Sequence, residues 1–303
     1  MMEKTVFQQK ITALLPDIIC KFYEPMSKHT SFQIGGPAEV MLFPRSTDEL
    51  ADILKVSSLL DCKCAILGAG TNVLAPDAGL DGMVICLKDG LADMKRIDRT
   101  RILVGAGVTM ARAAVYAAGL GLSGLEFAHG IPGTVGGGVY MNAGAYGGEI
   151  ADVCESVDVM IGDGTVVTYR ADEMDFSYRH SRVEEDGCIV LSAVFRLQEK
   201  PESEIRAQMQ DLKQRRTASQ PLDIPSAGSA FKRPVGGYAA ALIDGAGLKG
   251  FRVGDAAVSE KHAGFVVNLG KAKASDVLTL LQEVSDRVYS GSGIRLEPEM
   301  RIW

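Results

Sequence analysis

The spacing of apolar and polar residues predicts many short strands and a few helices in the first 200 residues. Apolar side chains recur on one side of residues 3–15, which indicates an amphipathic helix. The sequence Ser46-Thr-Asp-Glu49 has the form of a capping box and predicts a helix to about residue 60. Thr109 is expected to cap a second helix, which ends at Gly119. Apolar runs predict strands at residues 38–43, 64–67, 83–87, 101–104, 153–161, 165–169 and 188–197. Strands this frequent favour an α+β fold over a strict alternation of strand and helix.

The pattern changes after Lys200-Pro201, where a charged helix is predicted over residues 202–216. Residues 220–225 are bounded by prolines and are predicted to be extended, as at a junction between domains. The elements expected beyond this junction are helices at residues 237–244 and 275–290 and strands at residues 229–232, 262–269 and 294–303.

Composition and charge exclude several classes of protein. The 303 residues suffice for two domains, and 23% charged with 47% hydrophobic residues is ordinary for a globular chain. The net charge of −6 argues against non-specific nucleic-acid binding, which needs clustered cations. We find no secretory signal and no apolar stretch of about 20 residues, so no membrane insertion is expected.

The number and spacing of the cysteines bear on metal binding and on the cellular compartment. The six cysteines are scattered, and Cys62-Lys-Cys64 has no histidine at zinc-finger spacing. We therefore expect buried, reduced thiols, no metal site and a cytoplasmic protein.

Glycine is over-represented: 34 of 303 residues is about 11%, against a usual share near 7%. The run Gly68-Ala-Gly-Thr-Asn72 directly follows a predicted strand and can turn backbone N–H groups towards a pyrophosphate. It is not a Rossmann fingerprint, because Val73 stands where the third glycine would be, and Gly105-x-Gly107 fails in the same way at Met110. A purely turn-forming role is the alternative for both.

A second glycine-rich run, Gly130–Gly138, is apolar and uncharged, and Asn142–Gly148 follows it. A flexible linker would be polar, so this segment is expected to be a packed loop. Two uncharged glycine loops suit backbone donors wrapped around a bulky anionic cofactor. The alternative is a tightly turned structural loop.

These residues give the chain a resemblance to the MurB family of UDP-N-acetylenolpyruvoylglucosamine reductases. Seven segments resemble the family in its order and span nearly the whole chain. They are His29–Gly36, Leu67–Leu74, Glu126–Gly137, Asn142–Gly147, Phe176–Ser181, Ala227–Pro234 and Leu296–Arg301.

The resemblance implies an α+β flavoprotein of the vanillyl-alcohol-oxidase type. An FAD-binding domain would cover residues 1–200, with subdomains of about 1–62 and 63–200. A substrate-binding domain would cover 201–295, and 296–303 would be a strand that returns to the active site. FAD is expected to be non-covalent, because neither Gly68–Leu74 nor Gly133–Ala143 contains His or Cys, although His129 is adjacent. The resemblance implies FAD contacts at Gly68, Ala69, Gly70, Thr71, Asn72, Val73, Leu74, Gly130, Ile131, Pro132, Gly133, Thr134, Gly136, Gly137 and Ile189.

The family reaction passes hydride from NADPH to FAD and then to the enolpyruvyl ether of UDP-N-acetylglucosamine, which yields UDP-N-acetylmuramate. Hydride addition leaves negative charge on the substrate carboxylate and the adjacent carbon, so donors must already point there and a proton must follow. By resemblance Ser229 is the proton donor, and Arg179 and Glu299 stabilise the charge. To donate a proton, Glu299 would need a raised pKa from burial. Glu297 is its rival, since both would lie on the same face of a strand.

Candidates for the substrate's diphosphate are Arg216, Lys232, Lys261 and His262, and Tyr146 and Tyr178 are candidates for contacts with either the flavin or the substrate. A solvated surface role is an equal alternative for the four basic residues. One branch of the family inserts a Tyr-bearing loop that clamps the substrate. Only 50 positions separate Arg179 from Ser229, and predicted elements fill them, so this chain resembles the shorter branch. We expect small-molecule partners only and a monomer. The alternatives are another FAD-dependent oxidoreductase of the superfamily and a non-catalytic flavin-binding protein.

Overall fold

The computed structural model describes the backbone of residues 2–303 and the side chains of residues 6–303. The chain forms two compact units from discontinuous segments. Unit 1 contains Met1–Phe22, Val40–Ala69 and Gly82–Gln214, and unit 2 contains Tyr23–Glu39, Gly70–Asp81 and Arg215–Trp303. The first glycine loop thus changes unit between Ala69 and Gly70. The domain limits that the resemblance implies stay a prediction.

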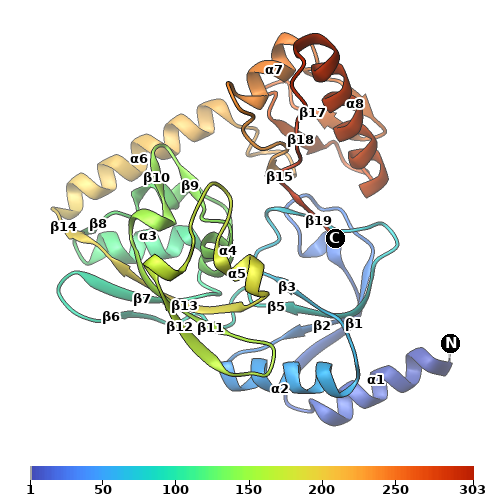
Figure 1. Ribbon diagram of the computed structural model, residues 1–303, viewed down its shortest axis with the longest axis vertical. Coiled ribbons are helices and arrows are strands. Elements are labelled where there is room, and N and C mark those ends of the chain that lie inside the picture. The colour runs from blue at the N-terminus through green and yellow to red at the C-terminus, as the bar shows by residue number, and fades with distance from the viewer. Residues whose placement is uncertain (1) are drawn as a thin grey trace. The chain divides into compact units, whose positions relative to one another are not determined.

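A four-stranded sheet has the order β1 (Ile19–Pro25), β2 (Pro37–Phe43), β5 (Leu80–Cys86) and β3 (Cys64–Leu67). Strand β3 runs parallel to β5, with Leu67 opposite Cys86. Helices α1 (Met2–Leu14) and α2 (Thr47–Leu59) lie along one face of this sheet (Figure 1). Their buried Ile11, Leu50 and Ile53 share a core with Val40 and Ile85 of the sheet.

The larger sheet of unit 1 is entirely antiparallel. Its order is β12 (Val166–Arg170), β11 (Cys154–Met160), β13 (Ile189–Arg196), β7 (Arg101–Gly105) and β6 (Met94–Arg96). Helices α3 (Met110–Gly119) and α4 (Val135–Tyr140) pack against it over a core that includes Val104, Val139, Ala193 and Phe195. The other elements of unit 1 are β8 (Leu122–Ser123), β9 (Gly144–Ala145), β10 (Gly148–Glu149), β14 (Gln198–Glu199), α5 (Arg182–Asp186) and the 3₁₀ helices η2 (Glu126–Gly130), η3 (Ile150–Asp152) and η4 (Ala171–Glu173).

Unit 2 contains a second antiparallel sheet with the order β15 (Ser226–Ser229), β18 (Phe265–Asn268), β17 (Ala256–Val258) and β16 (Arg252–Val253). Helices α7 (Ala239–Gly245) and α8 (Ala274–Ser292) lie beside it (Figure 1) and share its buried core. A short parallel pair joins β4 (Val73–Leu74) to β19 (Arg301–Ile302). The 3₁₀ helix η1 (Met26–Lys28) also belongs to unit 2, and α6 (Glu202–Ser219) begins in unit 1 and ends in unit 2.

The two helices that were predicted from capping residues are confirmed. The Ser46 side chain accepts a hydrogen bond from the Glu49 N–H at the start of α2, and Thr109 caps α3 through the Arg112 N–H. The α+β class is confirmed as well. Strand β1 was not predicted.

The glycine-rich segment is not all loop, contrary to prediction. It begins at the last residue of η2 and runs into the helix α4, which includes Gly136, Gly137 and Gly138. Glycine disfavours a helix, but tertiary packing overrides this preference here. A Cβ on Gly138 would stand 2.7 Å from the Met110 sulfur, so a larger residue here would require the Met110 side chain to move.

The predicted C-terminal strand over residues 294–303 is also wrong, since only Arg301–Ile302 is a strand. Pro298 has no N–H to donate, and it forms an isolated bridge with Phe231 instead of a regular ladder. The strand expected at residues 229–232 lies at Ser226–Ser229.

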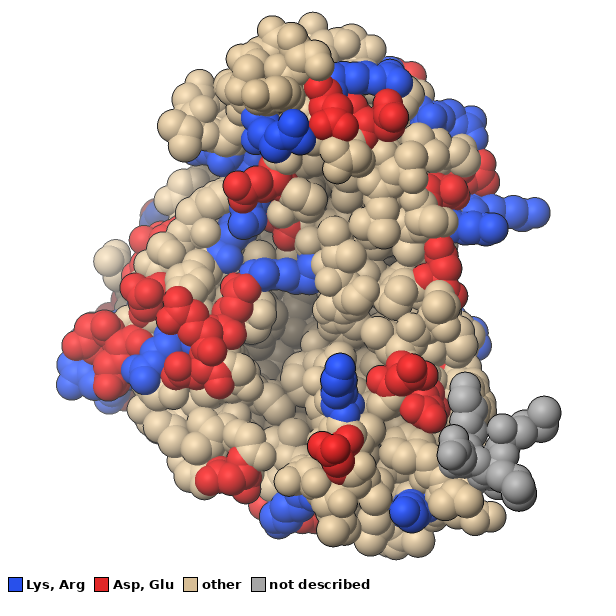
Figure 2. Space-filling view, turned by 45° about the vertical axis from the view of Figure 1, so that its right-hand side comes forward, with Lys and Arg blue, Asp and Glu red and all other residues tan. Residues whose placement is uncertain are grey.

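Charged side chains of both signs are interspersed on the face shown in Figure 2, with no extended patch of one sign. Among the described residues, no helix has the length and apolar character needed to span a membrane.

Candidate active site

The first glycine loop begins where β3 ends, and its opening residue lies against the second glycine loop. A Cβ added to Gly68 would stand 2.5 Å from Oγ1 of Thr134, which is closer than side chains tolerate. Among the described residues, the backbone N–H groups of Gly68, Ala69 and Gly70 donate no hydrogen bond. Amides without a protein acceptor in a glycine turn are donors for an anionic group such as a pyrophosphate.

Gly70 continues this loop in unit 2 and can only be glycine. Its φ is +62°, and an added Cβ would stand 2.1 Å from the carbonyl oxygen of His29. The Ser31 N–H donates to the carbonyl oxygen of Gly70 at 3.0 Å, which fixes the turn. The loop then enters β4, where Leu74 is buried and pairs with Ile302.

The second glycine loop, Gly130–Thr134, leads into α4. The first amides of this helix already have acceptors inside the protein, since Val135 donates to the Val108 carbonyl and Gly136 to the Ala106 carbonyl. The Gly137 N–H donates to Oγ1 of Thr134 at 3.4 Å. The start of α4 therefore has no amides left for a phosphate.

The residues fit FAD on these observations. The amides at Gly68–Gly70 suit the pyrophosphate, and the apolar, uncharged second loop suits a flat ring system. Among the predicted contacts, Leu74 and Ile189 have side chains in hydrophobic cores, so any contact they make is limited to what their backbones expose.

Arg179 lies in a tight hairpin turn in unit 1. Ser177 and His180 exchange two backbone hydrogen bonds of 3.2 Å, which leaves Tyr178 and Arg179 as the turn residues. The φ of Arg179 is +57°, a left-handed conformation that costs about 1 kcal/mol for a residue with a Cβ. The guanidinium carbon lies 5.2 Å from the centroid of the exposed Tyr178 ring. Strain of this kind is often retained at functional sites.

A cluster of one imidazole and two carboxylates borders this turn. Nε2 of His180 lies 3.6 Å from a carboxylate oxygen of Asp175 and 3.5 Å from one of Glu185. These ligand-type atoms lie within 4.8 Å of one another, and both carboxylates are largely exposed. Contacts between the imidazole and the two carboxylates account for the arrangement.

Unit 2 brings Ser229, Glu299 and the first glycine loop together. The Glu299 N–H donates to the carbonyl oxygen of Ala230 at 2.9 Å, and Nδ2 of Asn72 donates to the carbonyl oxygen of Glu299 at 3.3 Å. Ser229 ends β15 just after a shift in strand register, a distortion that re-aims a side chain. Its half-buried hydroxyl has no hydrogen-bond partner among the described residues.

Glu297 and Glu299 differ in their surroundings. The Glu297 side chain is 75% exposed, and its carboxylate lies 3.6 Å from Nζ of Lys232. Glu299 is half-buried. The expectation that strand alternation puts both on one face does not hold, because this segment is not a strand.

The remaining candidates have mixed environments. Tyr146 is exposed at the tip of the β9–β10 hairpin, Arg216 is half-buried near the end of α6, and Lys261 donates from Nζ to the Thr217 carbonyl at 2.7 Å. Nδ1 of His262 accepts from the Gly264 N–H at 3.1 Å, which leaves Nε2 as the protonated nitrogen. Burial lowers the pKa of His262, so its ring is neutral at pH 7 and acts as a donor rather than a cation.

This shift predicts a pH dependence of stability. The pKa of His262 is lower in the folded state than in the unfolded state, so the unfolded chain binds the proton more tightly. The contribution is fully present above the unfolded pKa of about 6.5 and is lost as pH falls below it. His262→Gln should therefore flatten the fall in the free energy of unfolding between about pH 7 and pH 5, measured by urea denaturation. An unchanged slope would contradict the assignment.

Sequence reasoning missed the structural role of Asn72. It was expected to contact the cofactor, but its side-chain amide binds the Glu299 backbone, 227 positions away in the chain. A local pattern carries no signal for such a contact.

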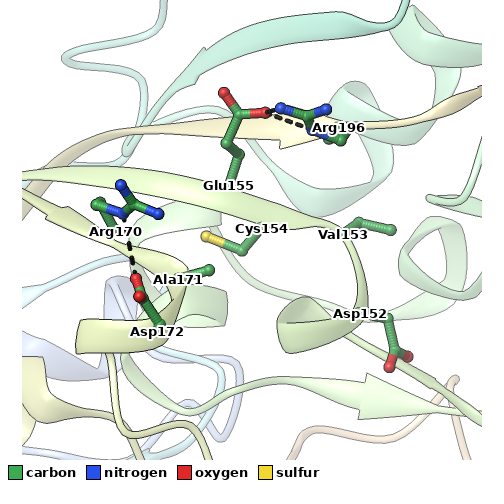
Figure 3. Close-up of a pocket in the computed structure, with 8 residues that line it drawn as sticks. All are labelled: Asp152, Val153, Cys154, Glu155, Arg170, Ala171, Asp172 and Arg196. Atoms are coloured by element: carbon green, nitrogen blue, oxygen red, sulfur yellow. Dashed lines mark hydrogen bonds and ion pairs between the residues drawn. The ribbon is translucent and has the colours of Figure 1, made fainter.

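Figure 3 shows a separate hollow on unit 1, with a volume of about 420 Å³. It is lined by Asp152, Val153, Cys154, Glu155, Arg170, Ala171, Asp172 and Arg196. Glu155 accepts a hydrogen bond of 2.6 Å from Arg196 and another from Arg101, and Arg170 pairs with Asp172. Its arginines are thus paired with nearby carboxylates, and the hollow contains no predicted site residue.

Comparison with known proteins agrees with this geometry. Residues 220–303 match the family described as UDP-N-acetylenolpyruvoylglucosamine reductase, C-terminal domain, and residues 38–170 match the FAD binding domain family. A UDP-N-acetylenolpyruvoylglucosamine reductase of Agathobacter rectalis is 47% identical, with 98% of each chain covered. One from Syntrophomonas wolfei is 43% identical, with 97% of this chain and 98% of the relative covered.

A solved structure extends the similarity to three dimensions. The crystal structure of the Thermus caldophilus UDP-N-acetylenolpyruvylglucosamine reductase (MurB) has a TM-score of 0.78 and 38% identity, and the alignment covers 94% of this chain and 98% of that one. With these relatives aligned along almost their full length, the chain belongs to the UDP-N-acetylenolpyruvoylglucosamine reductase family.

Proposed function

We propose that this protein uses NADPH and FAD to reduce the enolpyruvyl ether of UDP-N-acetylglucosamine to UDP-N-acetylmuramate, a step in peptidoglycan precursor synthesis. Family membership supports the reaction. One structural observation carries the proposal. Ser229 is the last residue of β15 in unit 2, and its hydroxyl has no hydrogen-bond partner among the described residues. The carbonyl oxygen of the next residue, Ala230, accepts a hydrogen bond from the Glu299 N–H. A proton donor and a carboxyl group are thereby held on neighbouring segments.

The reaction adds a hydride and a proton across the carbon–carbon double bond, while NADPH is oxidised to NADP⁺. Bound FAD supplies the relay of the hydride from NADPH to the terminal carbon. Arg179 holds the substrate carboxylate through its fixed guanidinium fork, and Glu299, as a neutral carboxylic acid, donates a hydrogen bond to the negative charge that develops there. The Ser229 hydroxyl then protonates the adjacent carbon and recovers its proton from solvent.

We assign the pyrophosphate of FAD to the loop Gly68–Leu74 and the flavin ring to Gly130–Gly137, with Ile189 nearby. The donor amides at Gly68, Ala69 and Gly70 support the first assignment. The apolar character of the second loop supports the other. FAD is bound without a covalent link.

The UDP moiety needs donors and cations for its diphosphate. We assign these to Arg216, Lys232, Lys261 and His262, and we assign sugar or flavin contacts to Tyr146 and Tyr178. His262 contributes a neutral N–H donor from Nε2, which follows from its hydrogen bond to Gly264. Lys232 and Lys261 must first release Glu297 and the Thr217 carbonyl.

We also propose that the protein acts as a monomer in the cytoplasm. The six cysteines are free thiols, as a reducing compartment would keep them. Light scattering should give a mass near 32.3 kDa, and twice that value would refute the monomer.

The two rival glutamates give a direct test of the site. Glu299→Gln should lower turnover by about 10- to 1,000-fold, because it removes a charge-stabilising group. Glu297→Gln should leave turnover within about 2-fold, because an exposed ion pair with Lys232 contributes 0–1 kcal/mol at most. The measurement is NADPH consumption that depends on the enolpyruvyl-UDP-sugar, with UDP-N-acetylmuramate identified by mass. If Glu297→Gln lowered turnover more than Glu299→Gln, the charge-stabilising role would belong to Glu297.

A further inference from the structure

Asn142 is a buried polar residue to which neither the fold nor the proposed reaction has given a role. It follows α4 directly, is 1% exposed and has a φ of +41°, a conformation that asparagine tolerates better than most residues. Its Oδ1 accepts from the Ala151 N–H at 3.0 Å, and its Nδ2 donates to the carbonyl oxygen of Ser177 at 3.1 Å. A backbone donor on one side and a backbone acceptor on the other fix the orientation of the amide.

Ser177 is the first residue of the turn that carries Arg179, and the other end of that turn is tied to the same helix. Ser181, which is fully buried, donates from its hydroxyl to the carbonyl oxygen of Tyr140 at 2.8 Å. Tyr140 is the last residue of α4. Two side-chain hydrogen bonds therefore connect the start and the end of the arginine turn to the C-terminus of one helix.

The opposite end of α4 begins in the second glycine loop, where Thr134 is the capping residue. The helix has six residues, a length of about 9 Å at 1.5 Å per residue. Close packing of Gly136 on Ala106 and of Gly138 on Met110 leaves it little freedom to shift. A movement of the loop at one end would thus be transmitted to the turn at the other.

We propose that Asn142 is a positioning residue for Arg179: through the Ser177 carbonyl it sets the place of the arginine turn relative to the flavin loop. The inference rests on the proposed function, because it concerns the same site. Asn142 itself is placed to touch neither substrate nor cofactor, since it is 1% exposed and its amide binds backbone groups on both sides. Its effect passes through the turn, which the strained φ of Arg179 makes sensitive to a lost anchor.

The test variant is Asn142→Asp, which keeps the shape and the bond from Ala151 but sets a carboxylate oxygen against the Ser177 carbonyl. Reduction of the flavin by NADPH and the dissociation constant for FAD should change by less than about 3-fold. Reoxidation by the enolpyruvyl-UDP-sugar should slow by about 10- to 100-fold, because a misplacement of 1 Å can cost 100-fold. Ser181→Ala removes the other anchor and should act in the same direction, which keeps the test available if the first variant does not fold.

A double-mutant cycle separates positioning from general destabilisation. If Asn142 acts through Arg179, Asn142→Asp should slow reoxidation by less than about 3-fold in an Arg179→Lys background. Asn268→Asp is the matched control, since Asn268 is equally buried and binds the Phe32 carbonyl in unit 2. Asn268→Asp should slow reoxidation by the same factor in the wild-type and the Arg179→Lys backgrounds, because the two sites are independent. The inference would be overturned if Asn142→Asp slowed reoxidation by the same factor in both backgrounds. It would also be overturned if the variant slowed flavin reduction and flavin reoxidation equally. A wild-type flavin that the enolpyruvyl-UDP-sugar does not reoxidise would instead overturn the proposed function.

Discussion

Replacing Ser229 with alanine is expected to separate the two half-reactions of the enzyme. NADPH should still bleach the flavin at the wild-type rate, because this step needs no proton from Ser229. Reoxidation by the enolpyruvyl-UDP-sugar should slow by about 100- to 10,000-fold, the usual effect of losing a positioned general acid. Stopped-flow absorbance at the flavin band measures both steps on the same protein.

The matched control for this variant lies in the same strand. Ser226→Ala removes a hydroxyl from β15 but keeps the backbone carbonyl that accepts the 2.6 Å hydrogen bond from Ser31. Both half-reactions should stay within about 2-fold of wild type. If Ser229→Ala reoxidises as fast as Ser226→Ala, Ser229 is not the proton donor.

Gly70→Ala is expected to have the largest effect on the protein as a whole. The added Cβ would stand 2.1 Å from the His29 carbonyl oxygen, which is part of the backbone and cannot swing aside. Overpacking costs about 1–3 kcal/mol, and the left-handed backbone at φ +62° adds about 1–2 kcal/mol for alanine. The free energy of unfolding should fall by about 2–5 kcal/mol, and the purified protein should contain little FAD, since the loop amides are displaced.

Gly119→Ala provides the comparison. Gly119 ends α3, and nothing lies within 4 Å of an added Cβ there. This variant should keep its flavin and unfold within about 0.5–1 kcal/mol of wild type, since alanine favours a helix. Urea denaturation with flavin absorbance measures both properties. Full flavin content and an unchanged midpoint in Gly70→Ala would refute the tight approach at His29.

The sequence was informative wherever the determinants of structure are local. The helix starts at Ser46 and Thr109 were correctly predicted, because a capping side chain and the amide it accepts are three residues apart. Strand β3 was predicted with its observed bounds, because a short apolar run before glycine signals a buried strand. The FAD-binding and reductase assignments came from the order of motifs, and the full-length relatives agree with them.

Features that depend on distant contacts could not be predicted. Helix α4 contains three consecutive glycines, and it forms because Ala106 and Met110 approach it closely. The C-terminal segment has apolar alternation, but Pro298 forms only an isolated bridge with Phe231 and no regular ladder. The neutral state of His262 follows from burial in unit 2, which no motif records. The different exposures of Glu297 and Glu299 likewise arise from the fold.

One anaerobic titration tests the central claim most directly. NADPH is added to the purified protein until the flavin band bleaches, and then the enolpyruvyl-UDP-sugar is added without oxygen. We predict that the band returns in proportion to the sugar added, which identifies the cofactor, the reductant and the oxidising substrate together. A band that only oxygen restores would show a different flavin oxidoreductase, and a protein that neither contains nor binds FAD would contradict the assignment of the glycine loops.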